Sequence, residues 1–149
     1  MSTRFILRGL LRAHLMKVHD IMPRPTILVA EPEPLQALSV RKLVLETAKF
    51  NVLTAHSSRE ALDIFHLFPN VSCAVLVPGK NIDCEMVARE VKKITKKVPV
   101  VFLHSAIGAV CKHADQALLS GEPEELLSLI RSLFGDPRTQ EPGEELRTT

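Results

Sequence analysis

The chain has 149 residues, 46% of them hydrophobic, and a formal net charge of +2. This length suits one domain with short tails. The residues after position 26 carry 14 basic and 16 acidic side chains, and this slightly acidic balance argues against a nucleic-acid-binding surface. Three widely spaced cysteines and the lack of any apolar run near the roughly 20 residues of a membrane span exclude a disulfide scaffold and an integral membrane segment. We therefore expect a cytoplasmic domain with free thiols and an aliphatic core.

The first 25 residues form a basic arm that differs in charge from the rest of the chain. Arg4, Arg8 and Arg12 recur every four residues, which would place them on one face of a helix. The simplest interpretation is a packed or frayed extension. Contact of residues 4–18 with a membrane surface or a partner is the alternative. The prolines of residues 22–25 end this arm.

The domain opens with a buried strand, predicted at Ile27–Ala30, that ends in the acidic, proline-rich turn Glu31–Pro34. Apolar residues at helical spacing predict a helix over Leu35–Ala48. Asn51–Ala55 is predicted to be the second strand, and Ser58 is expected to cap the second helix. The alternation of strand and helix begins here and continues through the chain.

The second half repeats the alternation. Ser72–Val77 is a continuous apolar run, as in strands buried on both faces, and Asn81 or Asp83 is expected to cap a helix ending at Ile94. The remaining elements are two strands and a last helix, predicted at Val98–Leu103, Gln116–Leu119 and Glu122–Phe134. Five strands alternating with helices predict a three-layer, doubly wound α/β domain over residues 26–135. The polar residues 136–149 predict a disordered tail.

Four strings in chain order resemble the receiver domain of bacterial response regulators, namely residues 27–34, 52–62, 99–106 and 114–127. The resemblance covers about residues 26–134. It implies a flavodoxin-like, five-stranded parallel sheet in the order 2-1-3-4-5. A receiver has a full fourth helix between the fourth and fifth strands, but only residues 106–113 are available for it here. We therefore expect a shortened fourth helix.

The resemblance also implies a chemistry that can be checked residue by residue. Receivers transfer a phosphoryl group to an Asp at the end of the third strand. An acidic pair after the first strand holds Mg²⁺, because a hard cation prefers oxygen ligands. A hydroxyl residue after the fourth strand and a Lys after the fifth bind the phosphoryl oxygens and balance their charge.

This chain keeps little of that pocket. Glu31 matches the first acid, but Pro32 replaces the second. The acceptor position falls on Leu76, Val77 or Pro78, none of which is a carboxylate. Ser105 matches the hydroxyl position, and Ser120 stands in place of the Lys. The sequence therefore predicts a degenerate receiver with no phosphoacceptor, no catalytic residue, and no metal or cofactor site.

Two other aspartates, Asp83 and Asp115, are the alternative acceptors by residue type. Asp83 lies several residues beyond the end of the third strand and is more simply a helix cap. Asp115 precedes the fifth strand, so it is expected to lie away from the pocket. Neither is predicted to accept a phosphoryl group.

The expected function is that of a non-phosphorylatable signalling domain in a bacterial two-component-type pathway, and not an enzyme. It would act by binding a kinase, an effector or a second copy of itself. The shortened fourth helix predicts an exposed apolar face at Ile107, Val110 and Leu118. The alternative is a small-ligand-binding domain that uses the carboxyl ends of the strands, around Glu31, Pro78, Ser105 and Ser120.

Overall fold

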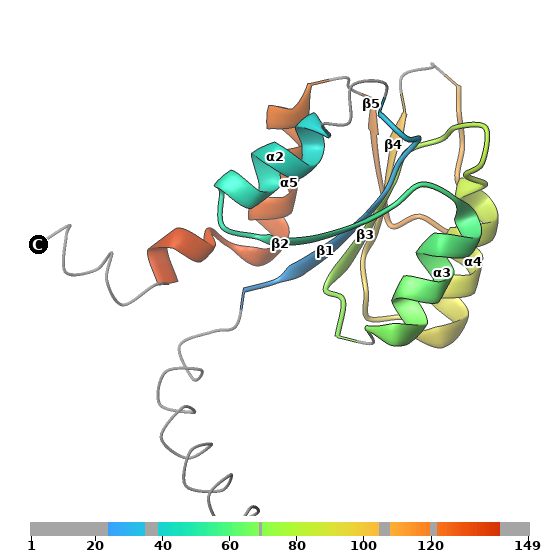
Figure 1. Cartoon of the computed structure of the whole chain (residues 1–149), viewed down its shortest axis with the longest axis horizontal. Helices are drawn as coiled ribbons and strands as arrows, with labels where there is room; N and C mark the ends of the chain where they lie inside the picture. Colours follow the sequence, from blue (N-terminus) through green and yellow to red (C-terminus); the bar gives the residue numbers. More distant parts are fainter. Residues whose placement is uncertain (1–23, 35–38, 69, 105–107, 120–121, 141–149) are drawn as a thin grey trace, which may run out of the picture.

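The computed structural model describes residues 24–34, 39–68, 70–104, 108–119 and 122–140. A five-stranded parallel sheet forms its centre, in the order β2-β1-β3-β4-β5 (Figure 1). The strands are β1 (Thr26–Ala30), β2 (Asn51–Ala55), β3 (Cys73–Leu76), β4 (Val100–His104) and β5 (Gln116–Leu119). The doubly wound fold and the strand order expected from the sequence are both confirmed.

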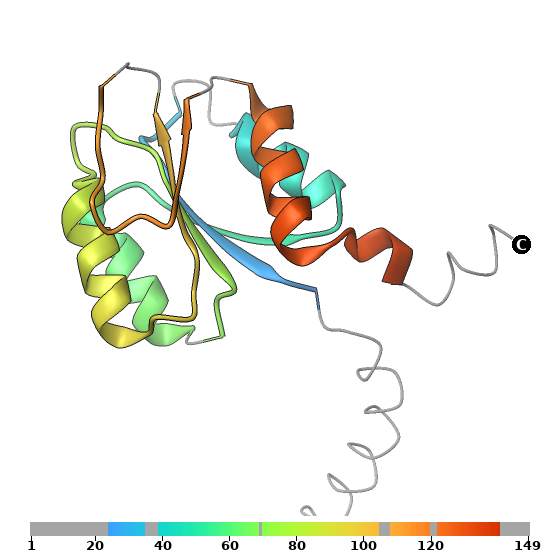
Figure 2. The ribbon, with the colours of Figure 1, turned by 180° about the vertical axis from the view of Figure 1, so that it is seen from behind.

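Two helices cover each face of the sheet (Figures 1 and 2). On one face α3 (Ser58–Leu67) packs beside α4 (Cys84–Ile94), and on the other α2 (Val40–Thr47) packs beside α5 (Pro123–Phe134). In parallel α/β folds each helix runs back against the strands, so the helices start near the edge where the strands end. We call this edge the carboxyl edge, and the edge where the strands begin the amino edge.

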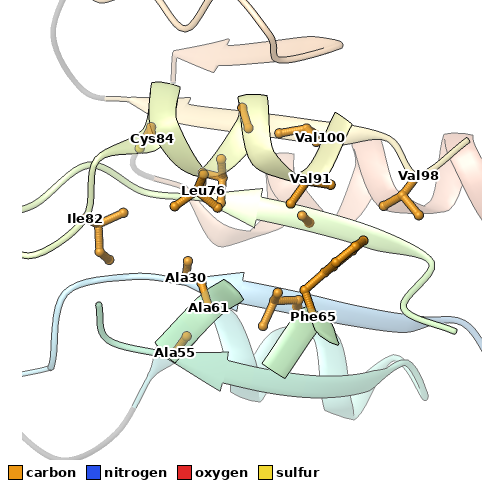
Figure 3. Close-up of a cluster of buried hydrophobic side chains, with 14 of the residues drawn as sticks. Ala30, Ala55, Ala61, Phe65, Leu76, Ile82, Cys84, Val91, Val98 and Val100 are labelled. Atoms are coloured by element: carbon orange, nitrogen blue, oxygen red, sulfur yellow. The ribbon is translucent and has the colours of Figure 1, made fainter. Parts of the chain in front are cut away.

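Side chains of the strands point alternately to the two faces and so fill two separate clusters. Figure 3 shows the cluster under α3 and α4, in which Phe65, Leu76 and Val91 are fully or almost fully buried. The cluster under α2 and α5 contains Ile27, Val29, Leu45, Val75, Leu126 and Ile130. All four residues of β3 are buried, as the continuous apolar run predicted.

The starts of α2 and α3 differ from those predicted, and α5 begins one residue late, at Pro123. The first helix of the domain, α2, begins at Val40, because the Ser39 side chain accepts a hydrogen bond from the Lys42 amide at 3.1 Å and caps it. The predicted start at Leu35 was therefore too early; residues 35–38 themselves lie outside the described part. In α3 the cap is Ser57, not Ser58, with its hydroxyl 3.1 Å from the Glu60 amide.

Ser58 has a different role from the predicted cap. Its hydroxyl donates to the Asn81 carbonyl at 3.3 Å and accepts from the Asp83 amide at 2.8 Å. Its own amide donates to the Asn81 carbonyl as well, at 2.8 Å. These bonds tie the start of α3 to the loop between β3 and α4, on the carboxyl edge.

The connection between β4 and β5 contains less helix than the shortened fourth helix predicted from the sequence. Residues 108–115, the described part of this connection, contain no helix. Ala109, Cys111 and Ala114 pack against the α3–α4 cluster in place of a helix. Residues 105–107 lie outside the described part.

The chain after α5 is more ordered than predicted. Residues Pro137–Gln140 form a 3₁₀ helix, η1, and Pro137 is buried. The Asp136 carboxylate accepts hydrogen bonds from the Arg138 amide and guanidinium at 3.0–3.2 Å, which stabilises this turn. The predicted disordered tail was therefore wrong for residues 137–140, and residues 141–149 lie outside the described part.

Candidate functional site

The carboxyl edge of the sheet brings together the residues that follow β1, β2 and β3. Ala30 is in register with Ala55 on one side and with Leu76 on the other. The next residues, Glu31 and Val77, therefore stand at the position where α/β sheets bind their ligands. The Val77 amide donates to the Ala30 carbonyl at 2.8 Å and the Glu31 amide donates to the Ala55 carbonyl at 2.9 Å.

Glu31 is a buried carboxylate whose charge is balanced within the protein. It is 2% exposed, and among the described residues it is the only charged or polar side chain classed as buried. Its Oε2 atom lies 3.0 Å from Nη1 of Arg41, a residue of α2. The other carboxylate oxygen, Oε1, is also buried and has no hydrogen-bond partner in the described part of the chain. The guanidinium of Arg41 thus supplies to Glu31 the positive charge that a metal ion supplies to the acidic pair of a receiver.

The backbone of Glu31 is held from the neighbouring strand as well. Nδ1 of His56, the residue after β2, lies 3.0 Å from the Glu31 carbonyl oxygen. Because a carbonyl oxygen only accepts hydrogen bonds, this nitrogen carries the proton. Glu31 is therefore fixed by groups from β2 and α2 together, and its side chain faces inward.

Pro32 closes the position of the second acid. A Cβ atom built on Gly79 would lie 2.3 Å from Cγ of Pro32, so the proline ring occupies the space beside the glycine backbone. A larger residue at Gly79 would collide with a rigid ring. The turn after β1 and the loop after β3 thus pack directly on each other.

None of the three candidate acceptor positions offers a carboxylate. Leu76 is fully buried in β3, Val77 is half-buried directly after the strand, and Pro78 is exposed. Asp83 caps α4, with Oδ1 3.1 Å from the Met86 amide, as predicted. Ser105 and Ser120, the hydroxyl and lysine positions of the pocket, lie outside the described residues.

Asp115 is bonded at the opposite, amino edge. Its Oδ2 atom accepts from the Val100 amide at 2.7 Å and lies 2.5 Å from Nζ of Lys92. Lys92 also donates to the Val98 carbonyl at 2.8 Å. These bonds join α4, β4 and the residue before β5. Asp115 is therefore a structural residue at the far edge from Glu31.

The residues present do not fit the Mg²⁺ site that the receiver resemblance implies. A divalent cation needs several oxygen ligands. Glu31 supplies one carboxylate, which is buried and already paired with Arg41, and Pro32 supplies no side-chain ligand. Within the described ranges, no group of three His, Cys, Asp or Glu residues is placed to hold a metal.

A hollow of about 400 Å³ lies beside the Glu31–Arg41 pair. Arg41, Ser39 and Glu33 contribute its polar lining, and Val77 and the prolines of the turn contribute its apolar lining. Of the residues named for the ligand-binding alternative, only Glu31 lines this hollow among those described. Pro78 does not.

The predicted apolar interaction face is only partly formed as expected. Val110 is 75% exposed, but Leu118 packs inward against the cluster under α2 and α5. Ala109 and Cys111, which flank Val110, pack against the other cluster, so Leu118 and Val110 do not share one face. Leu119, at the end of β5, is 51% exposed instead. Ile107 lies outside the described residues.

Glu85, in the first turn of α4, holds the loop that replaces the fourth helix. Its carboxylate accepts from the Lys112 amide at 2.6 Å and contacts Nδ1 of His113. The hydrogen bond with His113 is the main reason that the pKa of Glu85 lies below its usual range, and the amides of Lys112 and His113 add to the effect. Folding therefore favours the ionised form of this carboxylate.

We expect the loop to loosen in acid. Because the folded pKa of Glu85 is depressed, its contribution is complete above the usual value of about 4.3 and is lost as the pH falls through the folded pKa. The Lys112 amide proton, followed by NMR from neutral pH downwards, should show an inflection below that usual value. Glu85→Gln should abolish the inflection. An inflection at or above the usual value would contradict the assignment.

Comparisons with solved structures agree with the fold of the described residues. The structure is similar to a response regulator receiver domain protein from Clostridium thermocellum, with 27% identity, 72% of this chain and 92% of that chain covered, and a TM-score of 0.62. The described part of the chain has the fold of a receiver domain, and we call it the receiver-like domain. This fold supports a signalling domain of the two-component kind. No family model and no curated protein matches the receiver-like domain by sequence.

Two further solved structures show the same fold at lower identity. The response regulator TrrA from Thermotoga maritima, in complex with Mg²⁺–BeF, is 24% identical, with 74% of this chain and 99% of that chain covered and a TM-score of 0.61. A CheX–CheY–BeF₃–Mg²⁺ complex from Borrelia burgdorferi matches with 17% identity, 75% and 90% coverage, and a TM-score of 0.60.

Sequence reasoning missed Arg41, His56, Gly79 and Glu85. Arg41 is one of several cations in a helical run, and nothing in its spacing marks it as the partner of Glu31. The only usable signal was indirect, since a buried carboxylate next to a proline requires a counter-charge from elsewhere. Which cation supplies it depends on how α2 packs beside β1.

Proposed function

We propose that the receiver-like domain is not phosphorylated and acts as a protein-interaction or dimerisation module in a bacterial two-component-type pathway. One observation carries the proposal: the Arg41 guanidinium lies against the buried Glu31 carboxylate at 3.0 Å. In a working receiver this carboxylate would face a metal ion. Here the charge is balanced internally, and Pro32 packs on Gly79 where a second acid would reach the metal.

The β3 side of the pocket supports the same proposal. Val77 directly follows Leu76, the last residue of β3, which is in register with Ala30, and an isopropyl group cannot accept a phosphoryl group. The nearest aspartate along the chain, Asp83, is bonded to the Met86 amide as the cap of α4. Loss of an acceptor, a metal ligand and a lysine in one pocket is harder to compensate than a single loss.

Partner binding is proposed for the β4–β5 side of the domain. Residues 108–115 leave β5 without a covering helix there, and Val110 and Leu119 are exposed large hydrophobic side chains. Their exposure supports a protein partner, which would be a kinase, an effector or a second copy. The complex of CheX with CheY, a protein of this fold, is consistent with such a role.

An enzymatic role is not proposed. Burial raises the pKa of the Cys84 thiol to about 12 and that of Cys111 to about 11, which opposes formation of a nucleophilic thiolate.

The free state of Cys73, Cys84 and Cys111 supports a reducing, cytoplasmic location. Among the described residues no helix is long and apolar enough to cross a bilayer.

Intact mass spectrometry after incubation with acetyl phosphate and Mg²⁺ tests the first part. We expect the mass of the receiver-like domain to stay unchanged. A phosphoryl adduct that is stable in the wild type and lost in Asp83→Asn would overturn the proposal.

Sedimentation velocity over a range of concentrations tests whether the domain associates with itself. The Val110→Asp/Leu119→Asp variant is expected to abolish any self-association. Arg59→Asp, exposed on α3, is the surface control.

The second candidate function is binding of a small anionic ligand in the hollow beside Arg41. The observation that favours it is that the Arg41 guanidinium lines a space of about 400 Å³ and donates to Glu31 through one of its nitrogens, Nη1. A panel of small carboxylates and phosphates, screened by thermal shift, tests it. A compound that raises the melting temperature of the wild type but not of Arg41→Lys would favour this candidate over the interaction module.

A further inference from the structure

The amino edge of the sheet carries exposed apolar side chains at the ends of two helices. Leu67 is the last residue of α3 and Phe68 its C-cap, and Ile94 is the last residue of α4. They are 74%, 46% and 47% exposed. Figure 2 shows that α3 and α4 end side by side, at the same end of the molecule as the start of β1 and β4. These three side chains protrude from helix ends rather than lining the core.

Lysines lie before and after Ile94 in the chain, at the end of α4. Lys92 and Lys93 lie in the last turn of α4, where a positive charge complements the helix dipole. Each is paired, with Asp115 and Glu90 respectively. The dipole does not account for Lys96 and Lys97, which follow the helix, are exposed, and make no ion pair with any described residue. Asp115 and Glu90 balance Lys92 and Lys93, so the charges of Lys96 and Lys97 make this part of the edge positive.

The described part of the chain also begins at this edge. Residues 4–17 carry Arg4, Arg8, Arg12 and Lys17, and the chain enters the described structure at Arg24 and Pro25. The Pro25 carbonyl accepts from the Asn51 amide at 3.0 Å, which fixes this entry at the start of β1 and β2. The described chain therefore begins at the same edge as Lys96 and Lys97, and the sequence that precedes it is basic.

We propose that the amino edge docks on an anionic lipid surface. Leu67, Phe68 and Ile94 would enter the headgroup region, and Lys96 and Lys97 would lie over the acidic headgroups. Apolar side chains flanked by unpaired cations are the composition that binds such a surface, and each cation near it raises partitioning roughly fivefold. A bilayer also needs no complementary groove, which suits side chains that protrude. The edge is distinct from the β4–β5 side proposed for protein binding.

Co-sedimentation of the full chain with vesicles tests the proposal. We expect binding to vesicles of phosphatidylglycerol and phosphatidylcholine, little binding to phosphatidylcholine alone, and release by salt. Leu67→Ser/Phe68→Ser and Lys96→Gln/Lys97→Gln should each weaken binding about tenfold or more. The matched controls, Leu43→Ser on α2 and Lys80→Gln/Lys112→Gln, change exposed residues elsewhere and should bind as the wild type does. Circular dichroism melting confirms that every variant is folded.

Several results would overturn the proposal. Equal binding to both kinds of vesicle would remove the role of anionic lipid. Loss of binding in Arg8→Glu/Arg12→Glu, with both amino-edge variants unaffected, would show that the arm binds without the edge. Binding to polyglutamate that depends on Lys96 and Lys97 but not on Leu67 and Phe68, with no vesicle binding, would identify an acidic protein as the partner instead.

Discussion

Replacing Arg41 with methionine is expected to lower the free energy of unfolding by about 3 kcal/mol, because it leaves a buried carboxylate without its counter-charge. Glu31 is 2% exposed and its Oε2 atom has Arg41 as its cationic partner at 3.0 Å. Arg41 itself is 29% exposed, which places the expected loss at the lower end of the range for buried pairs. Urea unfolding followed by far-UV circular dichroism measures the change, since the sequence has no Trp or Tyr for fluorescence.

A second variant separates the lost charge pair from lost packing. Glu31→Gln in the Arg41→Met background removes the unpaired charge, so it should recover most of the stability. Arg59→Met is the control, because Arg59 is exposed on α3, and it should change stability by no more than about 0.5 kcal/mol. If Arg41→Met is as stable as Arg59→Met, the pair does not hold Glu31 and the main support for the proposed function is lost.

Replacing Phe65 with alanine is expected to cost about 3–5 kcal/mol. Phe65 is 2% exposed and belongs, with Val91 and Ala61, to the cluster between α3, α4 and the sheet (Figure 3). Removing the ring leaves a cavity that the close-packed strands cannot fill. The same urea titration measures the loss as a lower midpoint at an unchanged slope.

Phe68 provides a matched control for the loss at Phe65. It is the same residue type at the end of the same helix but is 46% exposed, so Phe68→Ala should cost about 1 kcal/mol or less. Equal losses at the two positions would contradict the described packing of α3. A small loss at Phe68 would also show that its ring is not needed for folding, as the proposed lipid contact requires.

Much of the fold could be predicted from the sequence because its signals are local. The continuous apolar run around β3 indicates burial on both faces, and the alternation of strands and helices indicates a parallel sheet. The wrong cap of α3 arose because two neighbouring side chains compete for one position. Ser57 and Ser58 are equivalent as caps by residue type, and Ser58 is taken up by the Asn81 carbonyl and the Asp83 amide instead.

The candidate site was harder to predict because its partners are distant in sequence. Leu118 was expected at an exposed face because it is apolar and follows a shortened connection. Strand alternation turns it inward, against the α2–α5 cluster, and leaves Leu119 at the surface. Glu85 holds Lys112 and His113 across 27 and 28 residues, and no periodicity reports such a pairing.

The amino-acid sequence by itself determined the doubly wound fold and the losses in the pocket, because residue type alone shows that Pro32, Leu76, Val77 and Pro78 carry no carboxylate. It also showed that one acid, Glu31, survives. Only the tertiary structure decided what that acid does, because a buried charge must be balanced by whichever group the packing brings near it. The packing of α2 brings Arg41 to 3.0 Å, and the surviving acid becomes half of an ion pair.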